Sequence, residues 1–178
     1  MTDFGIEPET DLERRILADP EWIEGAAYEA RMAGHPEPRV GDHVQEVLDN
    51  VDRFCAGSAD RARLRLIALT HDTFKHRVRW WLPWRNDHAR LARRFAAKHV
   101  SDHAVLEVIE LHDEGYRAWR AADKTGDWPK AEARAKAVIE RLGDALGLFV
   151  EFYRCDNATG DKAPNDRRWF EAIAERRS

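Results

Sequence analysis

Cysteine is scarce in this chain, and its scarcity excludes one class of small folds. Only two of the 178 residues are cysteine, Cys55 and Cys155, and no CxxC spacing occurs. Two cysteines are too few for a scaffold in which several disulfides replace a hydrophobic core. Cys155 lies in an apolar run, so we expect it to be a buried, reduced thiol.

Long apolar runs and an excess of positive charge are also absent. No stretch of 18 apolar residues occurs, so we expect neither a membrane span nor a membrane partner. Residues 1–7 are acidic and lack the apolar segment of a signal peptide, which favours a cytoplasmic protein. The formal net charge of −4 at pH 7 is not the basic excess of a nucleic-acid-binding protein, although it is compatible with a local basic patch.

The sequence further lacks the alternating β-branched runs that build a sheet. Apolar residues instead recur at helical spacing, in a chain that is 43% hydrophobic and 35% charged. We therefore expect an all-α fold with one compact helical domain over residues 34–162. We expect a helical extension packed on it over 1–33 and a short helix within 163–178. Predicted helices cover residues 11–18, 21–32, 42–54, 60–75, 88–99, 102–119, 129–156 and 169–175.

Four histidines fall on the inward stripes of four different predicted helices. The clearest stripe is Leu64, Ile67 and Ala68, which His71 continues at the next turn. Two carboxylates also fall at inward positions, beside or at the end of such stripes. The full set is His43, His71, His88, His112, Asp72 and Asp156.

A buried metal centre is one interpretation of this set, and a packed core is the other. A single inward histidine is usually a core residue that bonds to a neighbour such as an adjacent aspartate. Four of them, with two carboxylates, bury polar groups that each need a partner, and a metal ion would satisfy them together. Imidazole and carboxylate donors suit one or two divalent transition metal ions, Mn, Fe, Co, Ni or Zn, while no thiolate indicates a structural zinc.

The remaining histidines carry weaker signals. We expect all four at the surface, with two of them, His76 and His103, as reserve candidates for substrate contact; the other two are His35 and His99. Residues 76–85 mix arginine and tryptophan around a proline and are expected to form a loop. In one interpretation the tryptophans pack this loop against the protein and the arginines are solvated. In the other, the tryptophans and arginines bind a nucleotide or phosphate by stacking and ion pairing.

The order His43 … His71-Asp72 … Asp156 on a helical scaffold resembles the HD-domain superfamily of metal-dependent phosphohydrolases. Gly34-His-Pro-Glu-Pro-Arg-Val-Gly-Asp-His43 is similar to the corresponding stretch of HD domains in bacterial CCA-adding tRNA nucleotidyltransferases. Leu66-Ile-Ala-Leu-Thr-His-Asp-Thr-Phe-Lys75 is similar to the family's apolar helix ending in His-Asp-x-x-Lys, with Thr-Phe where many members have Leu-Gly. Phe152-Tyr-Arg-Cys-Asp156 resembles the closing Arg-x-Asp segment. The resemblance covers about residues 34 to 162.

The resemblance implies a ligand set and a reaction. It implies that His43, His71, Asp72 and Asp156 hold a first metal. It further implies that the pair formed by His88 and His112, 24 positions apart, holds a second ion as in binuclear members, with Asp72 bridging both. A water activated by the metal would then attack phosphorus.

Lys75 lies one helical turn beyond His71, where it either binds the substrate phosphate or is a solvated lysine at a helix end. Asp72 and Lys75 are thus the candidate catalytic residues. Arg77, Arg79 and Arg85 are lower-ranked candidates for a phosphate or base contact.

Three functions remain open on the sequence alone. The first is hydrolysis of a phosphomonoester or phosphodiester, of a nucleotide or a small metabolite, with a small phosphorylated substrate as the partner. The second is oxidation of a substrate by O₂ at two irons, as in HD-like proteins with the six-ligand pattern. The third is a non-catalytic helical binding module with the tryptophan-rich loop as a protein contact. The metal, the substrate and the oligomeric state stay undetermined, a homodimer included.

Overall fold

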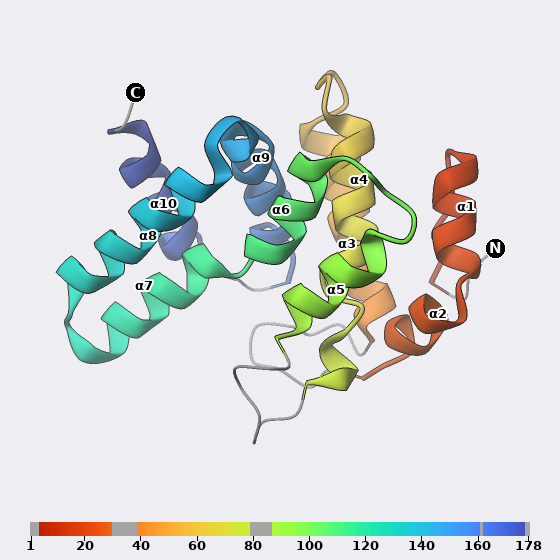
Figure 1. The fold of residues 1–178 in the computed structure, drawn as a ribbon, viewed down its shortest axis with the longest axis horizontal. Helices are drawn as coiled ribbons and strands as arrows, with labels where there is room; N and C mark the ends of the chain where they lie inside the picture. Colours follow the sequence, from red (N-terminus) through yellow and green to blue (C-terminus); the bar gives the residue numbers. More distant parts are fainter. Residues whose placement is uncertain (1–3, 30–38, 79–86, 161, 177–178) are drawn as a thin grey trace.

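The structure, a computed structural model, describes residues 4–29, 39–78, 87–160 and 162–176 and confirms the all-α fold (Figure 1). No strand occurs within these ranges. The elements are α1 (Asp11–Ala18), α2 (Pro20–Ala26), α3 (Val40–Phe54), α4 (Arg61–Thr70), the 3-10 turn η1 (Lys75–Arg77), α5 (His88–Ala96), α6 (His103–Leu111), α7 (Glu114–Thr125), α8 (Trp128–Leu142), the 3-10 turn η2 (Gly143–Ala145), α9 (Leu146–Asn157) and α10 (Asn165–Glu175).

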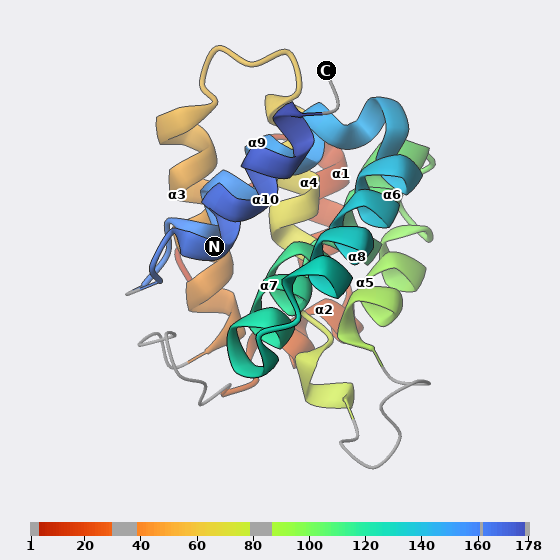
Figure 2. The ribbon, with the colours of Figure 1, turned by 90° about the vertical axis from the view of Figure 1, so that its left-hand side faces the viewer.

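Helix α4 lies at the centre of the molecule, and other helices surround it (Figures 1 and 2). It packs against α3, α5, α6 and α9, the four helices that carry or adjoin the other candidate site residues. The predicted stripe of Leu64, Ile67 and Ala68 is fully buried, as is His71 just after the helix. The interior position of α4 therefore follows from its apolar stripe, and it directs the C-terminal end of the helix into the core.

Helices α1 and α2 brace α4 from one side. Arg65 on α4 is buried and pairs with the buried Glu13 of α1, with 2.9 Å between Nε and Oε1. Trp22 of α2 is also buried, and its indole nitrogen donates a 2.7 Å hydrogen bond to the carbonyl of Leu69. These contacts tie the N-terminal helices to the central helix, close to the point where α4 ends.

Helices α7 and α8 form a hairpin that packs against α10 on the opposite side of the molecule (Figure 1). Gly126 makes the turn with a φ of +78°, a conformation that glycine adopts without a Cβ clash. Asp127 then caps α8 by accepting a hydrogen bond from the amide of Lys130, and Pro129 follows in the first turn. Local turn chemistry thus accounts for the hairpin.

Two of the predicted long helices are broken in the structure. The expected helix 102–119 ends at Leu111, and α7 starts at Glu114 in a new direction. Gly115 lets the first turn of α7 pack closely against Tyr153 of α9, because a Cβ at this position would lie only 2.9 Å from the tyrosine ring. The expected helix 129–156 is interrupted at Gly143, whose φ of +50° does not continue an α-helix.

Helix α4 itself is shorter than the predicted 60–75, because residues 71–74 form a turn before η1. Helix α3 begins two residues before its predicted start, with Arg39 at the N-cap and Asp42 bonded back to the Arg39 amide.

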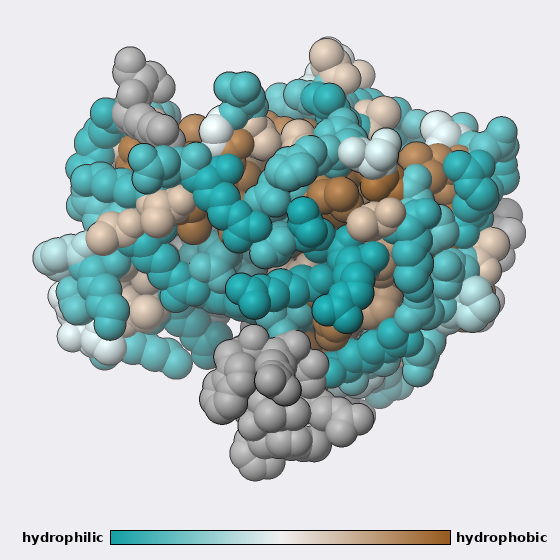
Figure 3. Space-filling model, viewed as in Figure 1, coloured by the Kyte–Doolittle hydropathy of each residue, from teal (hydrophilic) through white to brown (hydrophobic). Residues whose placement is uncertain are grey.

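The surface in Figure 3 is covered mostly by hydrophilic residues, and hydrophobic ones show between them. Among the described helices, none combines the length and the apolar character needed to cross a bilayer. Cys55 and Cys155 are both buried and form no disulfide, in agreement with the expectation for Cys155, and their sulfur atoms lie 3.8 Å apart.

Candidate metal centre

The six residues singled out in the sequence lie together in the interior, in two groups. In the first group, His43 from α3 and His71 from the end of α4 point their Nε2 atoms at each other, 3.3 Å apart. The Asp156 carboxylate from the end of α9 completes it, with Oδ1 at 3.1 Å from His43 Nε2 and 3.9 Å from His71 Nε2. Residues far apart in the sequence thus present three donor atoms to one point.

The second group repeats this arrangement a short distance away. His88, the first residue of α5, and His112, which follows α6, place their Nε2 atoms 3.3 Å apart. Both rings are buried, and Asp72 completes the group. Its Oδ1 lies 3.3 Å from His88 Nε2 and 3.5 Å from His112 Nε2.

Asp72 stands between the two histidine pairs. While its Oδ1 faces His88 and His112, its Oδ2 lies 3.4 Å from both His43 Nε2 and His71 Nε2. One carboxylate therefore offers one oxygen to each group. This is the geometry in which a carboxylate bridges two ions.

The end of α4 is built so that the His71-Asp72 turn keeps a fixed position. A helix leaves its last carbonyl groups without partners inside the helix. Here the Ala68 carbonyl bonds to the His71 ring at 3.0 Å, and the Leu69 carbonyl accepts from Trp22. Thr73 closes the turn by donating its hydroxyl to the Thr70 carbonyl at 2.9 Å. Every one of these partners is buried, so the turn is held on all sides.

Thr73 and Phe74, which follow the His-Asp pair, have structural roles. Thr73 supplies the hydroxyl just described, and Phe74 is buried against Phe95 of α5, with 5.1 Å between ring centroids. Both residues are used for packing and capping here, and neither approaches the donor atoms as a ligand.

Two of the histidines are oriented by the same backbone contact. His71 bonds through Nδ1 to the carbonyl three residues earlier, and His112 bonds in the same way to the Ile109 carbonyl at 2.8 Å. Because Nδ1 is then the protonated nitrogen, the lone pair of a neutral ring is on Nε2. A carbonyl behind the ring is the usual outer partner of a metal-binding histidine.

The donor set fits a metal ion on two counts. Two nitrogens bound to one ion at about 2.0–2.1 Å lie about 2.9–3.4 Å apart for tetrahedral to octahedral angles, and each pair measures 3.3 Å. Asp72 Oδ1 is also buried without accepting a hydrogen bond. Such an atom costs free energy unless a cation or donor satisfies it. The two groups are therefore candidate metal sites.

The electrostatics keep the carboxylates ionised. Burial alone would raise the pKa of Asp72, but the Lys75 ammonium and His71 outweigh it and hold that pKa well below its ordinary value. Burial acts in the same sense on Asp156, where Lys162 and His43 lower the pKa well below its ordinary value. Burial would lower the pKa of His112, yet neighbouring carboxylates raise it to about 9. The buried carboxylates thus stay ionised and can attract cations.

Two lysines flank the groups. The predicted Lys75 lies at the start of η1, with Nζ at 2.5 Å from Asp72 Oδ2, and its side chain is only 16% exposed. It is therefore an ammonium at the centre and not a solvated lysine. Lys162, which the sequence reasoning missed, lies 3.2 Å from Asp156 Oδ1. It falls in a turn-rich loop, where helical periodicity carries no signal.

Asp113 is the other residue that the sequence reasoning missed. It follows His112, and its Oδ2 lies 3.4 Å from His88 Nε2. Burial would raise its pKa, but His112 and His88 lower it. Arg117 contacts it at 3.4 Å and also binds Asp87, the residue that caps α5, through two hydrogen bonds of 2.6 and 3.0 Å.

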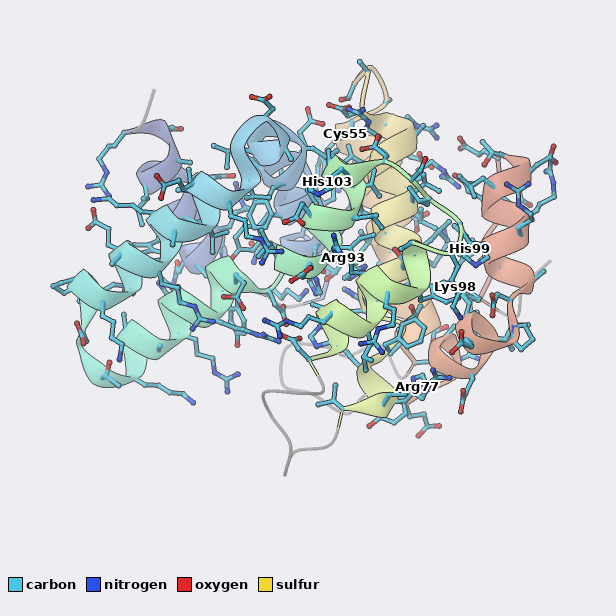
Figure 4. All side chains as sticks on the ribbon, viewed as in Figure 1. Cys55, Arg77, Arg93, Lys98, His99 and His103 are labelled. Carbon is cyan, nitrogen blue, oxygen red and sulfur yellow. The ribbon has the colours of Figure 1, made fainter. Side chains whose placement is uncertain are left out.

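None of the three weaker histidine candidates that the structure describes belongs to either group. His103 is exposed on α6, as predicted (Figure 4). His99, beyond the end of α5, is only 15% exposed and pairs with Asp19, so it is not the surface residue expected. His76 is similarly enclosed, with its Nδ1 bonded to the Thr73 carbonyl. His35 lies outside the described residues.

The arginine and tryptophan loop is only partly described. Arg77 points to α2, where it binds Glu21 at 2.7 Å and Glu24 at 2.9 Å (Figure 4). Its guanidinium is thus already engaged by carboxylates. Arg79 and Arg85 lie outside the described residues, as do the three tryptophans of the loop.

Comparison with known proteins adds no relative: no protein-family model matches the chain, and neither does any curated protein or any solved structure at a significant level.

Proposed function

We propose that the protein is a metal-dependent phosphohydrolase of the HD type, which cleaves a phosphomonoester or phosphodiester. The observation that carries the proposal is the position of Asp72, with one oxygen facing each histidine pair. Two divalent ions held in this way would supply an activated water molecule and would polarise phosphoryl oxygens. His43, His71 and Asp156 would hold one ion, His88 and His112 the other, with Asp72 shared.

The charge of the site supports an anionic substrate. In the form that binds ions the histidines are neutral, and Asp72, Asp113 and Asp156 together with the ammonium groups of Lys75 and Lys162 then carry about one negative charge. Two divalent ions would change this to about three positive charges. A phosphate ester, which brings its own negative charge, would then be attracted into the site.

Lys75 is the residue we propose for the phosphate itself. Burial alone would lower its pKa, but Asp72 and Asp113 raise it, so the side chain stays an ammonium. It is fixed by the 2.5 Å contact with Asp72 Oδ2. A fixed positive charge beside the reacting group stabilises the charge that develops on phosphate oxygens in the transition state. Asp72 orients this lysine as well as the metal sites.

The test uses purified protein loaded with Mn²⁺, Co²⁺ or Ni²⁺ and two generic esters, p-nitrophenyl phosphate and bis(p-nitrophenyl) phosphate. We expect one of the esters to be hydrolysed by the wild type and by Asp127→Asn, a matched change at the exposed α8 cap. We expect no turnover by Asp72→Ala, with the helical circular dichroism unchanged. Turnover retained in Asp72→Ala, or iron-dependent O₂ consumption without phosphate release, would overturn the phosphohydrolase assignment.

A further inference from the structure

The chain contains a second His-Asp pair, His112-Asp113, with the same backbone arrangement as His71-Asp72. His71 ends α4 with φ −54° and ψ −39°, and His112 ends α6 with φ −53° and ψ −36°. Both rings bond through Nδ1 to the carbonyl three residues earlier. Each helix therefore delivers a histidine Nε2 and, directly after it, a carboxylate.

The Asp113 carboxylate lies at about the same distances from the second histidine pair as the Asp156 carboxylate does from the first pair. Its oxygens lie 3.4 Å from His88 Nε2 and 3.7 Å from His112 Nε2. The corresponding distances at the first pair are 3.1 and 3.9 Å.

Asp113 also does not perform the structural role that its position suggests. It is the N-cap residue of α7, where an aspartate normally accepts a hydrogen bond from a backbone amide of the first turn. Its side chain makes no such bond. The carboxylate is directed instead towards the histidine pair, and Arg117 contacts at 3.4 Å the same oxygen, Oδ2, that faces His88. Helix capping therefore does not explain why an aspartate is present.

We infer that Asp113 is a fourth protein ligand of the second metal ion. The ion would then have two imidazoles, Asp72 Oδ1 and the Asp113 carboxylate, a donor set that matches the one at the first pair. Asp72 Oδ1, buried and without a hydrogen bond, faces the same two rings and provides independent evidence that a cation belongs there. The inference rests on the two-metal site of the proposed function.

Arg117 and Asp87 hold this arrangement in place. Arg117 makes two hydrogen bonds to Asp87, of 2.6 and 3.0 Å, and Asp87 accepts from the amide of Ala89 in the first turn of α5. The same arginine therefore connects the start of α5, which carries His88, with Asp113. This link acts as an outer support that fixes the distance between the two ligands.

The experiment is a Mn²⁺ titration of chelator-treated protein, followed by calorimetry and by electron paramagnetic resonance. We expect the wild type to bind two ions and Asp113→Asn to lose about 10–100-fold in affinity at one site only. Asp113→Glu should recover part of the loss. In a His88→Ala background, which already lacks the second site, Asp113→Asn should leave the remaining affinity unchanged. Asp127→Asn serves as the control for the loss of one carboxylate.

The outcomes separate this inference from the proposed function. Two ions bound with unchanged affinity in Asp113→Asn would overturn the Asp113 inference alone. An equal loss in the His88→Ala background would also overturn it, because Asp113 would then act through long-range charge. The predicted loss at one site, with no ester hydrolysis by the wild type, would support the ligand and overturn the hydrolase. A wild type that binds no ion would overturn both.

Discussion

Replacing Asp72 by asparagine should remove the stabilisation that metal ions give to this fold. The change keeps the side-chain volume and removes the charge that both histidine pairs share. Binding to the folded state at a free metal concentration of about 100 Kd adds about 2.7 kcal/mol per ion to the free energy of unfolding. For a chain of 178 residues, each kcal/mol raises Tm by about 2–4 °C, so one ion should raise it by about 5–11 °C.

The expected loss in the variant follows from the same relation. If the neutral amide weakens each site about 100-fold, the same metal concentration adds only about 0.4 kcal/mol per ion, or about 1–2 °C. His88→Ala should keep the larger shift for one ion, because the first group retains all four of its donors. The contrast between the two variants distinguishes a shared ligand from a ligand of one site.

The assay is differential scanning calorimetry of chelator-treated protein with and without Mn²⁺, for wild type, Asp72→Asn, His88→Ala and Asp127→Asn. Only the difference in Tm caused by metal is compared, because Asp72→Asn also removes the partner of Lys75. Asp127→Asn should match the wild type, since asparagine caps a helix as well as aspartate does. A full one-ion shift in Asp72→Asn would refute the bridging geometry.

Three further changes test the site, its electrostatics and its packing. Lys75→Ala should lower the turnover number for a phosphate ester about 10²-fold or more while metal content, measured by elemental analysis, stays the same. Burial would raise the pKa of Asp87, but Arg117 lowers this pKa from 3.8 to about 2. The ionised carboxylate therefore stabilises the fold above about pH 4, and this stabilisation is lost as the pH falls towards 2. Asp87→Asn should therefore remove about 2 kcal/mol at neutral pH and flatten this acid limb in urea unfolding. Gly25→Ala would place a Cβ 1.8 Å from the Thr73 carbonyl oxygen and should cost about 1–3 kcal/mol, whereas Gly57→Ala, with open space around it, should unfold at nearly the wild-type urea concentration.

The helical periodicity of the sequence was sufficient to identify the six candidate ligands as residues that face the interior. An apolar stripe fixes which way a helix faces, so a histidine that continues the stripe must point into the core. His71 is such a histidine, because the stripe of Leu64, Ile67 and Ala68 that precedes it is fully buried and His71 is buried with it. The same reasoning succeeds for Asp156, which ends the apolar face of α9 and lies beside His43.

The same periodicity failed where the chain changes direction without an obvious break. The stripe from Val105 to His112 continues through Tyr116 in the sequence, which favoured one helix. The structure turns after Leu111, and the buried face of α7 is formed by small residues while Tyr116 is exposed. That hidden turn is the reason why Asp113 was missed. The sequence indicated that His112 faces inward. The direction of the Asp113 side chain, however, depends on where α6 ends.

Metal content is the measurement that tests the account most directly. The protein should be purified without chelator and analysed for elements beside His88→Ala. We predict about two transition metal ions per chain in the wild type and about one in the variant, because the variant keeps His43, His71 and Asp156 of the first group together with the shared Asp72. No metal in either protein, with none taken up on reconstitution, would contradict the metal centre and the function proposed for it.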